Sequence, residues 1–164
     1  MPGAVKSARS VEMPLVDEAA TAALAENLAR IAKPGDIFAL EGELGCGKTA
    51  FARAFIRAAG AVDDDIPSPT FTLTQVYDGA NFTIHHFDLY RLCAPEEAFE
   101  LNIDDAFSSG VSLIEWPHHL GDLLPSDRLD VILSFADSET ARTVRLSGPK
   151  AWQKRLKGVR LKCL

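Results

Sequence analysis

The sequence predicts an α/β fold of the P-loop NTPase type: a three-layer α/β/α arrangement with a mixed sheet that includes an antiparallel hairpin. Residues 42–49, GELGCGKT, match the phosphate-binding pattern G-x-x-x-x-G-K-[ST] at every specified position. An apolar run at 37–40 leads into this loop as a strand, and residues 50–59 leave it with helical periodicity. Strand and helix patterns then alternate, with one hairpin inserted, as in sheets flanked by helices.

The segments before and after the loop have clear boundaries. Residues 9–13 are predicted to form an edge strand, and Asp17 is placed to cap a helix that runs to about Ala32. Residues 33–36, KPGD, turn the chain into the strand that precedes the loop. The helix after the loop is predicted to stop at Gly60.

The middle of the chain combines an extended loop with the hairpin. Residues 63–70, DDDIPSPT, are acidic and proline-rich, and they occupy the place where many P-loop proteins keep a switch segment. Residues 71–77 and 82–87 are rich in β-formers, and the turn residues 78–81 join them into an antiparallel hairpin.

The last third predicts two short helices, three strands and a final helix. Pro95 opens a helical stretch to about Leu101, and a second short helical piece covers 103–107. Residues 110–116 form a buried type of strand that ends at Pro117. Two strands at 129–135 and 143–146 precede a helix at 150–157.

The bulk properties predict one domain over residues 1–164, with a basic tail at about 149–164. A chain of 164 residues with 47% hydrophobic residues can bury a substantial core. We expect a soluble, unexported protein, because neither a signal peptide nor a membrane-length apolar run is apparent. Three cysteines without metal-ligand spacing suggest neither a disulfide framework nor a zinc site, and favour the cytoplasm.

The tail is the most basic part of an otherwise acidic chain. The net charge is −6, yet the last fifteen residues contain six basic and no acidic residues. Such asymmetry is compatible with contact to RNA or to an acidic protein surface. The alternative, which we favour, is a solvated helix face, because Trp152, Leu156 and Val159 recur at helical spacing and can pack inward.

The loop itself predicts phosphate chemistry. Its glycines let the backbone curl so that N–H groups converge on phosphate oxygens at the positive end of a helix. In this motif class the ammonium of Lys48 reaches the β- and γ-phosphates, and the hydroxyl of Thr49 coordinates Mg²⁺. Glu115, after a buried strand, is the best candidate for the acidic group near the metal. From the residues alone, however, we favour an ordinary exposed strand-end carboxylate, because most charged residues are exposed.

Several other residues have both a functional and a local explanation. Asp88, Ser68 and Thr70 can approach the phosphates, or they can serve strand-end and turn hydrogen bonds. His85 and His86 are adjacent on a strand, so they face opposite sides, and we expect both to be structural. Cys46 either has a pKa lowered by helix N-terminal donors or fills a small-residue position, and we favour the second.

Four blocks of sequence together resemble the TsaE (YjeE) family. They are residues 42–49 (GELGCGKT), 67–71 (PSPTF), 86–91 (HFDLYR) and 114–117 (IEWP), in this order and spacing. The resemblance implies a bacterial ATPase needed to make threonylcarbamoyladenosine in tRNA. It further implies binding to a TsaB–TsaD pair and ATP hydrolysis at their junction, with tRNA reached through that complex.

The resemblance also implies roles for individual residues. Lys48 grips phosphate, Thr49 and Glu115 serve Mg²⁺, and Asp88 belongs to the active site. The ATP-binding set implied in this way comprises Glu43, Leu44, Gly45, Cys46, Gly47, Lys48, Thr49, Ser68, Thr70 and Trp116. The chain departs from the family pattern at Cys46, where alanine is common, and at residues 118–119, where two histidines replace an acidic-then-basic pair.

Two other functions remain open at this point. A small-molecule kinase needs an acceptor pocket and usually an arginine-bearing lid, for which Arg91 is the only clear candidate. A nucleotide-dependent docking module needs ATP binding but not hydrolysis. A GTPase is disfavoured, because neither N-K-x-D nor D-x-x-G occurs in the chain.

Overall fold

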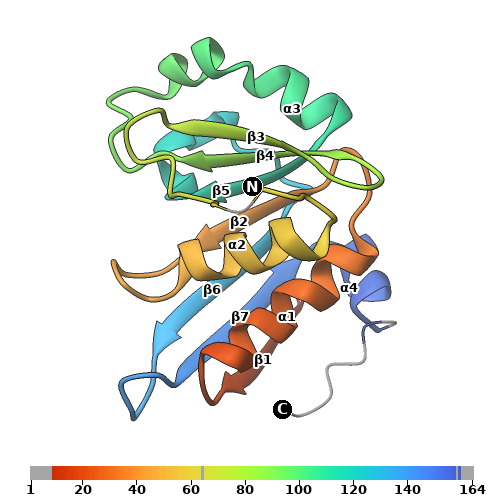
Figure 1. The fold of residues 1–164 in the computed structure, drawn as a ribbon, viewed down its shortest axis with the longest axis vertical. Helices are drawn as coiled ribbons and strands as arrows, with labels where there is room; N and C mark the ends of the chain where they lie inside the picture. Colours follow the sequence, from red (N-terminus) through yellow and green to blue (C-terminus); the bar gives the residue numbers. More distant parts are fainter. Residues whose placement is uncertain (1–8, 64, 158, 160–164) are drawn as a thin grey trace, which may run out of the picture.

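Seven strands form one mixed sheet in the computed structural model, which describes residues 9–63, 65–157 and 159 (Figure 1). The order across the sheet is β1 (Arg9–Leu15), β7 (Arg142–Gly148), β6 (Leu129–Phe135), β2 (Ile37–Glu41), β5 (Val111–Glu115), β4 (Thr83–Asp88) and β3 (Thr74–Asp78). The pairs β2–β5, β2–β6 and β4–β5 are parallel, whereas β1–β7, β6–β7 and β3–β4 are antiparallel. The predicted mixed sheet with an inserted hairpin is confirmed.

The helices begin and end close to their predicted positions. They are α1 (Glu18–Ile31), α2 (Lys48–Ala58), α3 (Ile103–Ser109) and α4 (Lys150–Lys157), with 3₁₀ segments η1 (Pro95–Leu101) and η2 (Pro117–Leu123). The carboxylate of Asp17 accepts the N–H of Ala20 at 2.9 Å, which is the predicted N-cap of α1. At the end of α2, Gly60 follows the C-cap residue Ala59 and takes φ +100°, a conformation that favours glycine.

Two hydrophobic cores lie on opposite faces of the sheet. Phe38 and Leu113 belong to the core that contains α1, α2 and α4, whereas their sequence neighbours Ile37 and Ile114 belong to the core with η1, α3 and η2. Since successive side chains of a strand point to opposite faces, the sheet is covered on both sides. The central strands β2 and β5 therefore read as continuous apolar runs, as expected for parallel strands buried on both faces.

The carboxyl ends of β2, β4 and β5 meet at one edge of the sheet, which is where the P-loop emerges (Figure 1). Asp88 pairs with Glu115 across β4 and β5, and Leu40 pairs with Glu115 across β2 and β5. This register brings two carboxylates beside residues 42–49 although they are far apart in sequence. In an open α/β sheet, such an edge is the usual place for a ligand site.

The first strand of the hairpin is shorter than predicted, because its expected start at Phe71 is wrong. Residues 71–73 form a turn instead: the N–H of Leu73 donates to the carbonyl of Pro69 at 2.7 Å, and Leu73 takes φ +64°. Pro67 and Pro69 hold the preceding segment away from strand pairing. Phe71 is consequently 83% exposed rather than half-buried on a sheet.

Pro117 ends β5 as predicted, but the chain continues directly into η2, which the sequence did not indicate. Trp116 makes this transition possible by adopting φ +58°, a left-handed conformation that is uncommon for a bulky residue. Pro117 then occupies the first turn, where its missing N–H is not needed.

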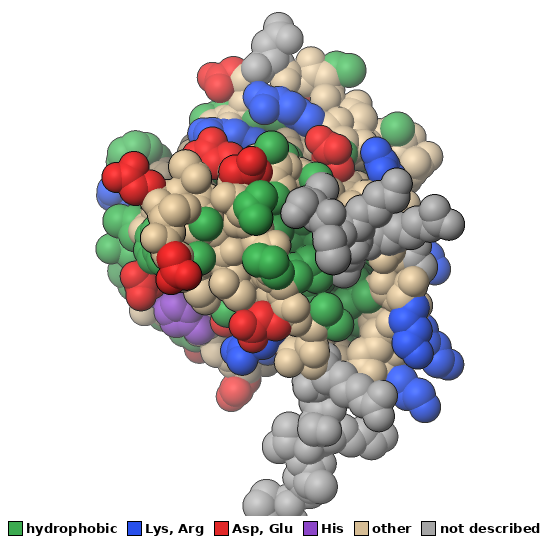
Figure 2. All heavy atoms as spheres, turned by 90° about the horizontal axis from the view of Figure 1, so that it is seen from below, with side chains coloured by type: hydrophobic (Ala, Val, Ile, Leu, Met, Phe, Trp, Pro, Cys, Tyr) green, Lys and Arg blue, Asp and Glu red, His purple; other side chains and the backbone are tan. Residues whose placement is uncertain are grey.

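The C-terminal helix packs as the solvated-face interpretation predicts. Trp152, Leu156 and Val159 are buried, and Arg155 donates to the carboxylate of Asp36 at 2.9 Å. The exposed side of α4 is basic, because it carries Lys150, Lys154 and Lys157. Lys and Arg side chains gather at the lower right edge of the face in Figure 2. The predicted remainder of the tail, residues 158 and 160–164, lies outside the described residues.

Among the described residues, no helix combines the length and the apolar character that a membrane crossing requires.

Candidate active site

A cavity of about 430 Å³ lies at the carboxyl edge of the sheet, against the P-loop. The sequence-predicted residues that line it are Leu44, Gly45, Cys46, Gly47, Lys48, Thr49, Ser68, Thr70, Asp88, Glu115 and Trp116. Among the predicted ATP-binding residues, only Glu43 is absent from this lining. These predicted residues come from four separate parts of the chain, which therefore converge on one site.

Glycines fix the shape of the P-loop at two points. Gly42 has φ +151°, and a Cβ atom there would lie 2.7 Å from the carbonyl oxygen of Leu133, so no side chain fits. Gly47, at φ +108°, precedes α2 and offers no side chain to cap its first turn. The first N–H groups of α2 are thus left available at the positive end of the helix for an anionic ligand.

Lys48 is buried at the bottom of this cavity. Its ammonium donates to the carbonyls of Gly42 and Glu43, the latter at 3.0 Å, and lies 4.1 Å from the ring centroid of Trp116. Burial lowers the pKa of Lys48, while the nearby Glu115 carboxylate opposes this effect. An ammonium has three N–H donors, so one remains for a ligand after the two carbonyl contacts.

Glu115 is held at both of its carboxylate oxygens. Oε1 accepts the hydroxyl of Thr49 at 2.9 Å, and Oε2 lies 2.7 Å from Nε2 of His86. The side chain is almost fully buried, so the alternative of an ordinary exposed strand end is wrong. Thr49 and Glu115, which are 66 positions apart in sequence, are in direct contact.

These two residues fit a Mg²⁺ ion. Neighbouring ligands of an octahedral Mg²⁺ lie about 3.0 Å apart when each metal–oxygen bond is about 2.1 Å, and the two side-chain oxygens are 2.9 Å apart. Within the described ranges, no group of three or more His, Cys, Asp or Glu side chains could hold a metal on its own. Mg²⁺ is typically held by one or two carboxylates together with substrate phosphates and water. The hydroxyl of Thr49 and the carboxylate of Glu115 fit this mode of coordination.

Asp88 is the second buried carboxylate of the site. Its Oδ2 accepts the hydroxyl of Ser68 at 3.1 Å, and its Oδ1 accepts the N–H of Tyr90 at 3.1 Å. Ser68 and Thr70 are joined by a hydroxyl contact of 3.0 Å. The proline-rich loop is therefore tied to the end of β4 and borders the cavity, so its hydroxyls do more than cap their own backbone.

Trp116 forms a wall of the cavity. The centroid of its ring lies 5.0 Å from that of Tyr90, and Trp116 also lines a smaller space together with Glu41 and His118. The left-handed backbone at Trp116 costs about 1–2 kcal/mol, and such strain is commonly found at functional sites. Here it directs the indole across the ammonium of Lys48.

Several further residues at the site were not among those predicted from the sequence. His86 contacts Glu115, and Glu18, Thr21, Thr140 and Arg142 line the end of the cavity formed by α1 and the β6–β7 connection. Arg142 donates from Nε to the carbonyl of Cys46 at 3.1 Å, across 96 positions of sequence. Only knowledge that β4 lies beside β5 could have found His86, because the pairing places it on the same face as Glu115.

The suggestion that Cys46 has a lowered pKa is wrong. The side chain is 1% exposed, and burial raises the pKa of its thiol, although the nearby Arg142 and Lys48 act in the opposite direction. Cys46 therefore fills a small-residue position in the core beneath the loop, which is the interpretation the sequence favoured.

The two adjacent histidines face opposite sides of β4, as predicted. His85 is stacked on Phe87 with 6.3 Å between ring centroids, and burial lowers its pKa. His86 is fully buried on the other face and reaches the site. The expectation that both are merely structural is therefore too simple for His86.

Comparison with known proteins shows consistent similarity over most of the chain. The family model described as "Threonylcarbamoyl adenosine biosynthesis protein TsaE" matches residues 15–144. A protein of Rickettsia felis named tRNA threonylcarbamoyladenosine biosynthesis protein TsaE is 44% identical over 123 residues, which cover 75% of this chain and 72% of that protein. A Bacillus subtilis protein of the same name is 38% identical over 120 residues, covering 73% of this chain and 74% of that protein.

A solved structure is similar over nearly the whole fold. The crystal structure of YdiB from Bacillus subtilis superposes with a TM-score of 0.76 and 30% sequence identity, covering 93% of this chain and 95% of that chain.

Proposed function

The chain belongs to the TsaE family, and from this premise we propose that it binds MgATP in the cavity at the P-loop and hydrolyses it in support of threonylcarbamoyladenosine formation in tRNA. In this proposal the isolated protein turns over slowly, and a TsaB–TsaD pair stimulates it. The reaction takes place in the cytoplasm, where buried and exposed thiols such as those of Cys46 and Cys93 stay reduced.

The observation that carries the proposal is the contact of Thr49 with Glu115 beside the buried ammonium of Lys48. The cavity also contains Asp88, so two carboxylates would face the negative charge of a triphosphate. Lys48 alone cannot neutralise that charge. A divalent cation held by Thr49 and Glu115 would supply the missing positive charge and bridge the phosphates.

Other parts of the cavity could bind the phosphates and the nucleoside of ATP. The N–H groups at the start of α2 and the remaining N–H of Lys48 would bind the phosphates. Glu18, Thr21 and Arg142 also line the cavity and would be available to contact the nucleoside. A space of about 430 Å³ is within the range usual for small-molecule sites.

Hydrolysis requires water to attack the γ-phosphorus while the bond to the β,γ-bridging oxygen breaks, giving ADP, phosphate and a proton. Asp88 is the residue of this chain best placed to orient that water, because Ser68 and Tyr90 fix both of its oxygens at the cavity. Phosphoryl transfer depends mostly on positioning and on charge stabilisation. A site with these groups but no additional cation at the γ-phosphate should bind well and turn over slowly.

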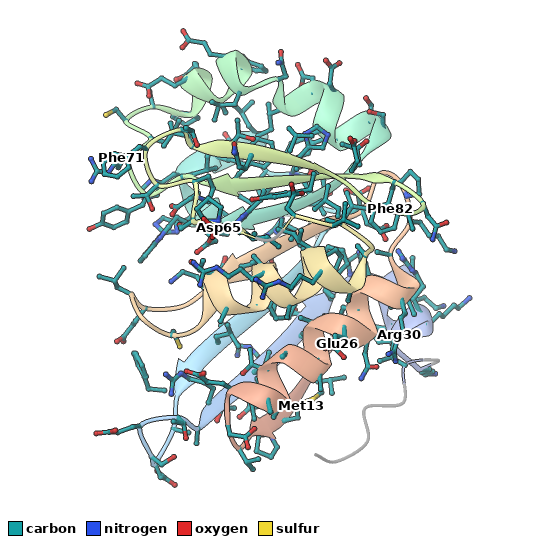
Figure 3. The ribbon with its side chains drawn as sticks, viewed as in Figure 1. Met13, Glu26, Arg30, Asp65, Phe71 and Phe82 are labelled. Carbon is teal, nitrogen blue, oxygen red and sulfur yellow. The ribbon has the colours of Figure 1, made fainter. Side chains whose placement is uncertain are left out.

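A docking partner could supply what the site lacks, because exposed apolar side chains lie in the lining of the cavity or against the arginines that line it. Leu44 is 76% exposed and Phe71 is 83% exposed, and Tyr90 and Phe135 are about half exposed. Leu44 and Tyr90 line the cavity, and Arg91, which also lines it, stacks on Phe71 at 4.8 Å. Figure 3 shows Phe71 projecting outward from the side of the molecule where the P-loop lies. Exposed apolar groups with a polar surround are typical of protein contact sites.

Phosphate release tests the proposal directly. We expect slow MgATP turnover by the protein alone, at least tenfold stimulation by TsaB–TsaD, and loss of turnover in Glu115→Ala with docking preserved. Unchanged turnover of Glu115→Ala in the presence of the partners would contradict the metal role of Glu115.

The same assay separates the two rival functions. A small-molecule kinase would consume ATP only with an acceptor metabolite, but Arg91 is stacked on Phe71 at the rim instead of standing free as a lid. A docking module would bind the partners in the presence of ATP without releasing phosphate at any partner concentration.

A further inference from the structure

Within the part of the chain that the structure describes, the side chain of His86 has one polar contact, which is with Glu115. The ring is fully buried in β4, and its Nε2 lies 2.7 Å from Oε2 of Glu115. Among the described residues, Nδ1 has no hydrogen-bond partner. The imidazole is therefore not a general cross-link of the core, since its polar edge serves this carboxylate.

The sheet register explains why the two side chains meet. His86 pairs with Leu113 in the parallel ladder of β4 and β5, and Asp88 pairs with Glu115 two positions further along. Residues two apart on a strand share a face, so His86, Asp88 and Glu115 all project to the side that carries α2. His86 lies behind Glu115 as seen from the cavity, and it does not line the cavity itself.

Contacts at both oxygens determine how the Glu115 carboxylate is oriented. Thr49 holds Oε1 at 2.9 Å from the cavity side, and His86 holds Oε2 from the protein interior. Without the imidazole, a carboxylate that is 2% exposed would lose its interior hydrogen bond and gain freedom to rotate. The oxygen that faces Thr49 would then no longer be held in place.

We propose that His86 is a positioning residue that orients Glu115 for Mg²⁺ and thereby sets the affinity of the protein–nucleotide complex for this ion. This inference rests on the proposed function, because it takes Glu115 as a metal ligand. Hydrogen-bond partners of metal ligands typically contribute ten- to a hundredfold to metal affinity. His86 is expected to act within that range without touching the ion, the nucleotide or the reacting atoms.

The test measures Mg²⁺ affinity without any turnover. Mg²⁺ is titrated by calorimetry into full-length protein saturated with a non-hydrolysable ATP analogue. His86→Leu removes the donor at similar volume and should weaken Mg²⁺ binding about ten- to a hundredfold. Affinity for the analogue in the absence of Mg²⁺ should stay within twofold of the wild type. His85→Leu is the matched control, because His85 lies on the opposite face and should leave both affinities unchanged.

A second pair of variants keeps the test decisive if His86→Leu does not fold. The glutamine side chain is long enough to place its amide nitrogen at the position of Nε2 of His86. The asparagine side chain is shorter, so its amide nitrogen lies at the position of Nδ1 and does not reach Glu115. His86→Gln should therefore retain most of the Mg²⁺ affinity that His86→Asn loses. If His86 had only a structural role, the Mg²⁺ affinities of the two variants would instead fall in proportion to their loss of thermal stability.

The outcomes distinguish this inference from the proposed function. If Glu115→Gln weakens Mg²⁺ binding but the folded His86 variants all bind it within twofold of the wild type, the positioning role is refuted and the metal site stands. If Glu115→Gln itself leaves Mg²⁺ affinity unchanged, the proposed metal site fails. A loss in His86→Asn with recovery in His86→Gln supports the proposal.

Discussion

Replacing Lys48 by methionine should separate nucleotide binding from fold stability. The substitution removes the ammonium and keeps most of the aliphatic stem that packs below the loop. Lys48 is 4% exposed, and two of its three N–H donors are already used by the carbonyls of Gly42 and Glu43. One donor and the full positive charge therefore remain for the phosphates.

The size of the loss follows from this geometry. A unit charge about 4 Å from a phosphate charge contributes about 4 kcal/mol at an effective dielectric constant of about 20. Each 1.4 kcal/mol is a factor of about ten in affinity, so Lys48→Met should weaken MgATP binding roughly a thousandfold. The thermal midpoint of the nucleotide-free protein should change little, because burial already disfavours the charged form and lowers the pKa of Lys48.

Calorimetry with MgATP measures the affinity, and a thermal melt without nucleotide measures the stability. Arg57→Met is the matched control, because Arg57 is an exposed cation on the same helix, α2, and its loss changes the net charge equally. The control should bind within about twofold of the wild type. Binding of MgATP to Lys48→Met within tenfold of the wild type would refute the phosphate role of this lysine.

Three further predictions concern the loop and the basic helix. Gly42→Ala should lower the free energy of unfolding by roughly 1–3 kcal/mol more than Gly45→Ala in urea denaturation, because an added Cβ meets the carbonyl of Leu133 at 2.7 Å in the first case and nothing within 4 Å in the second; equal losses would contradict the steric argument. In a variant with serine at the other two cysteine positions, Cys46 should react with iodoacetamide at pH 8 more slowly than a free cysteine does. Burial raises the pKa of its thiol, so the reactive thiolate forms only at higher pH. Reaction at the rate of free cysteine would contradict this prediction. Three exposed lysines of α4, Lys150, Lys154 and Lys157, can be replaced together by glutamine. The solvated-face interpretation requires that tRNA affinity at low salt, measured by filter binding, stays unchanged. A lower affinity with a smaller salt dependence would indicate an RNA contact instead.

The phosphate-binding loop was predictable from the sequence because it is a local structure. Residues 42–49 are consecutive, and their glycines, lysine and threonine encode the loop geometry and its chemistry without reference to distant residues. The same holds for the cap at Asp17 and for the helix at 150–157, whose boundaries depend on nearby residues.

The start of the hairpin shows where local patterns fail. Phe71, Thr72 and Leu73 have strand-forming composition, yet the segment turns because Leu73 bonds back to Pro69 and its carbonyl accepts the N–H of Asp88 at 3.0 Å. A contact with a residue fifteen positions away thus overrides the preference of the segment itself. Strand composition alone contains no information on that partner.

Only the tertiary structure decided which side chains meet at the P-loop. The sequence offered Glu115 and Asp88 as two candidate strand-end carboxylates, each with a local alternative. The parallel pairing of β4 with β5 and of β5 with β2 places both at the P-loop, and it brings His86 behind Glu115. Hydrogen bonding between strands sets this register, and it joins residues that are far apart along the chain, so no window of sequence can specify it.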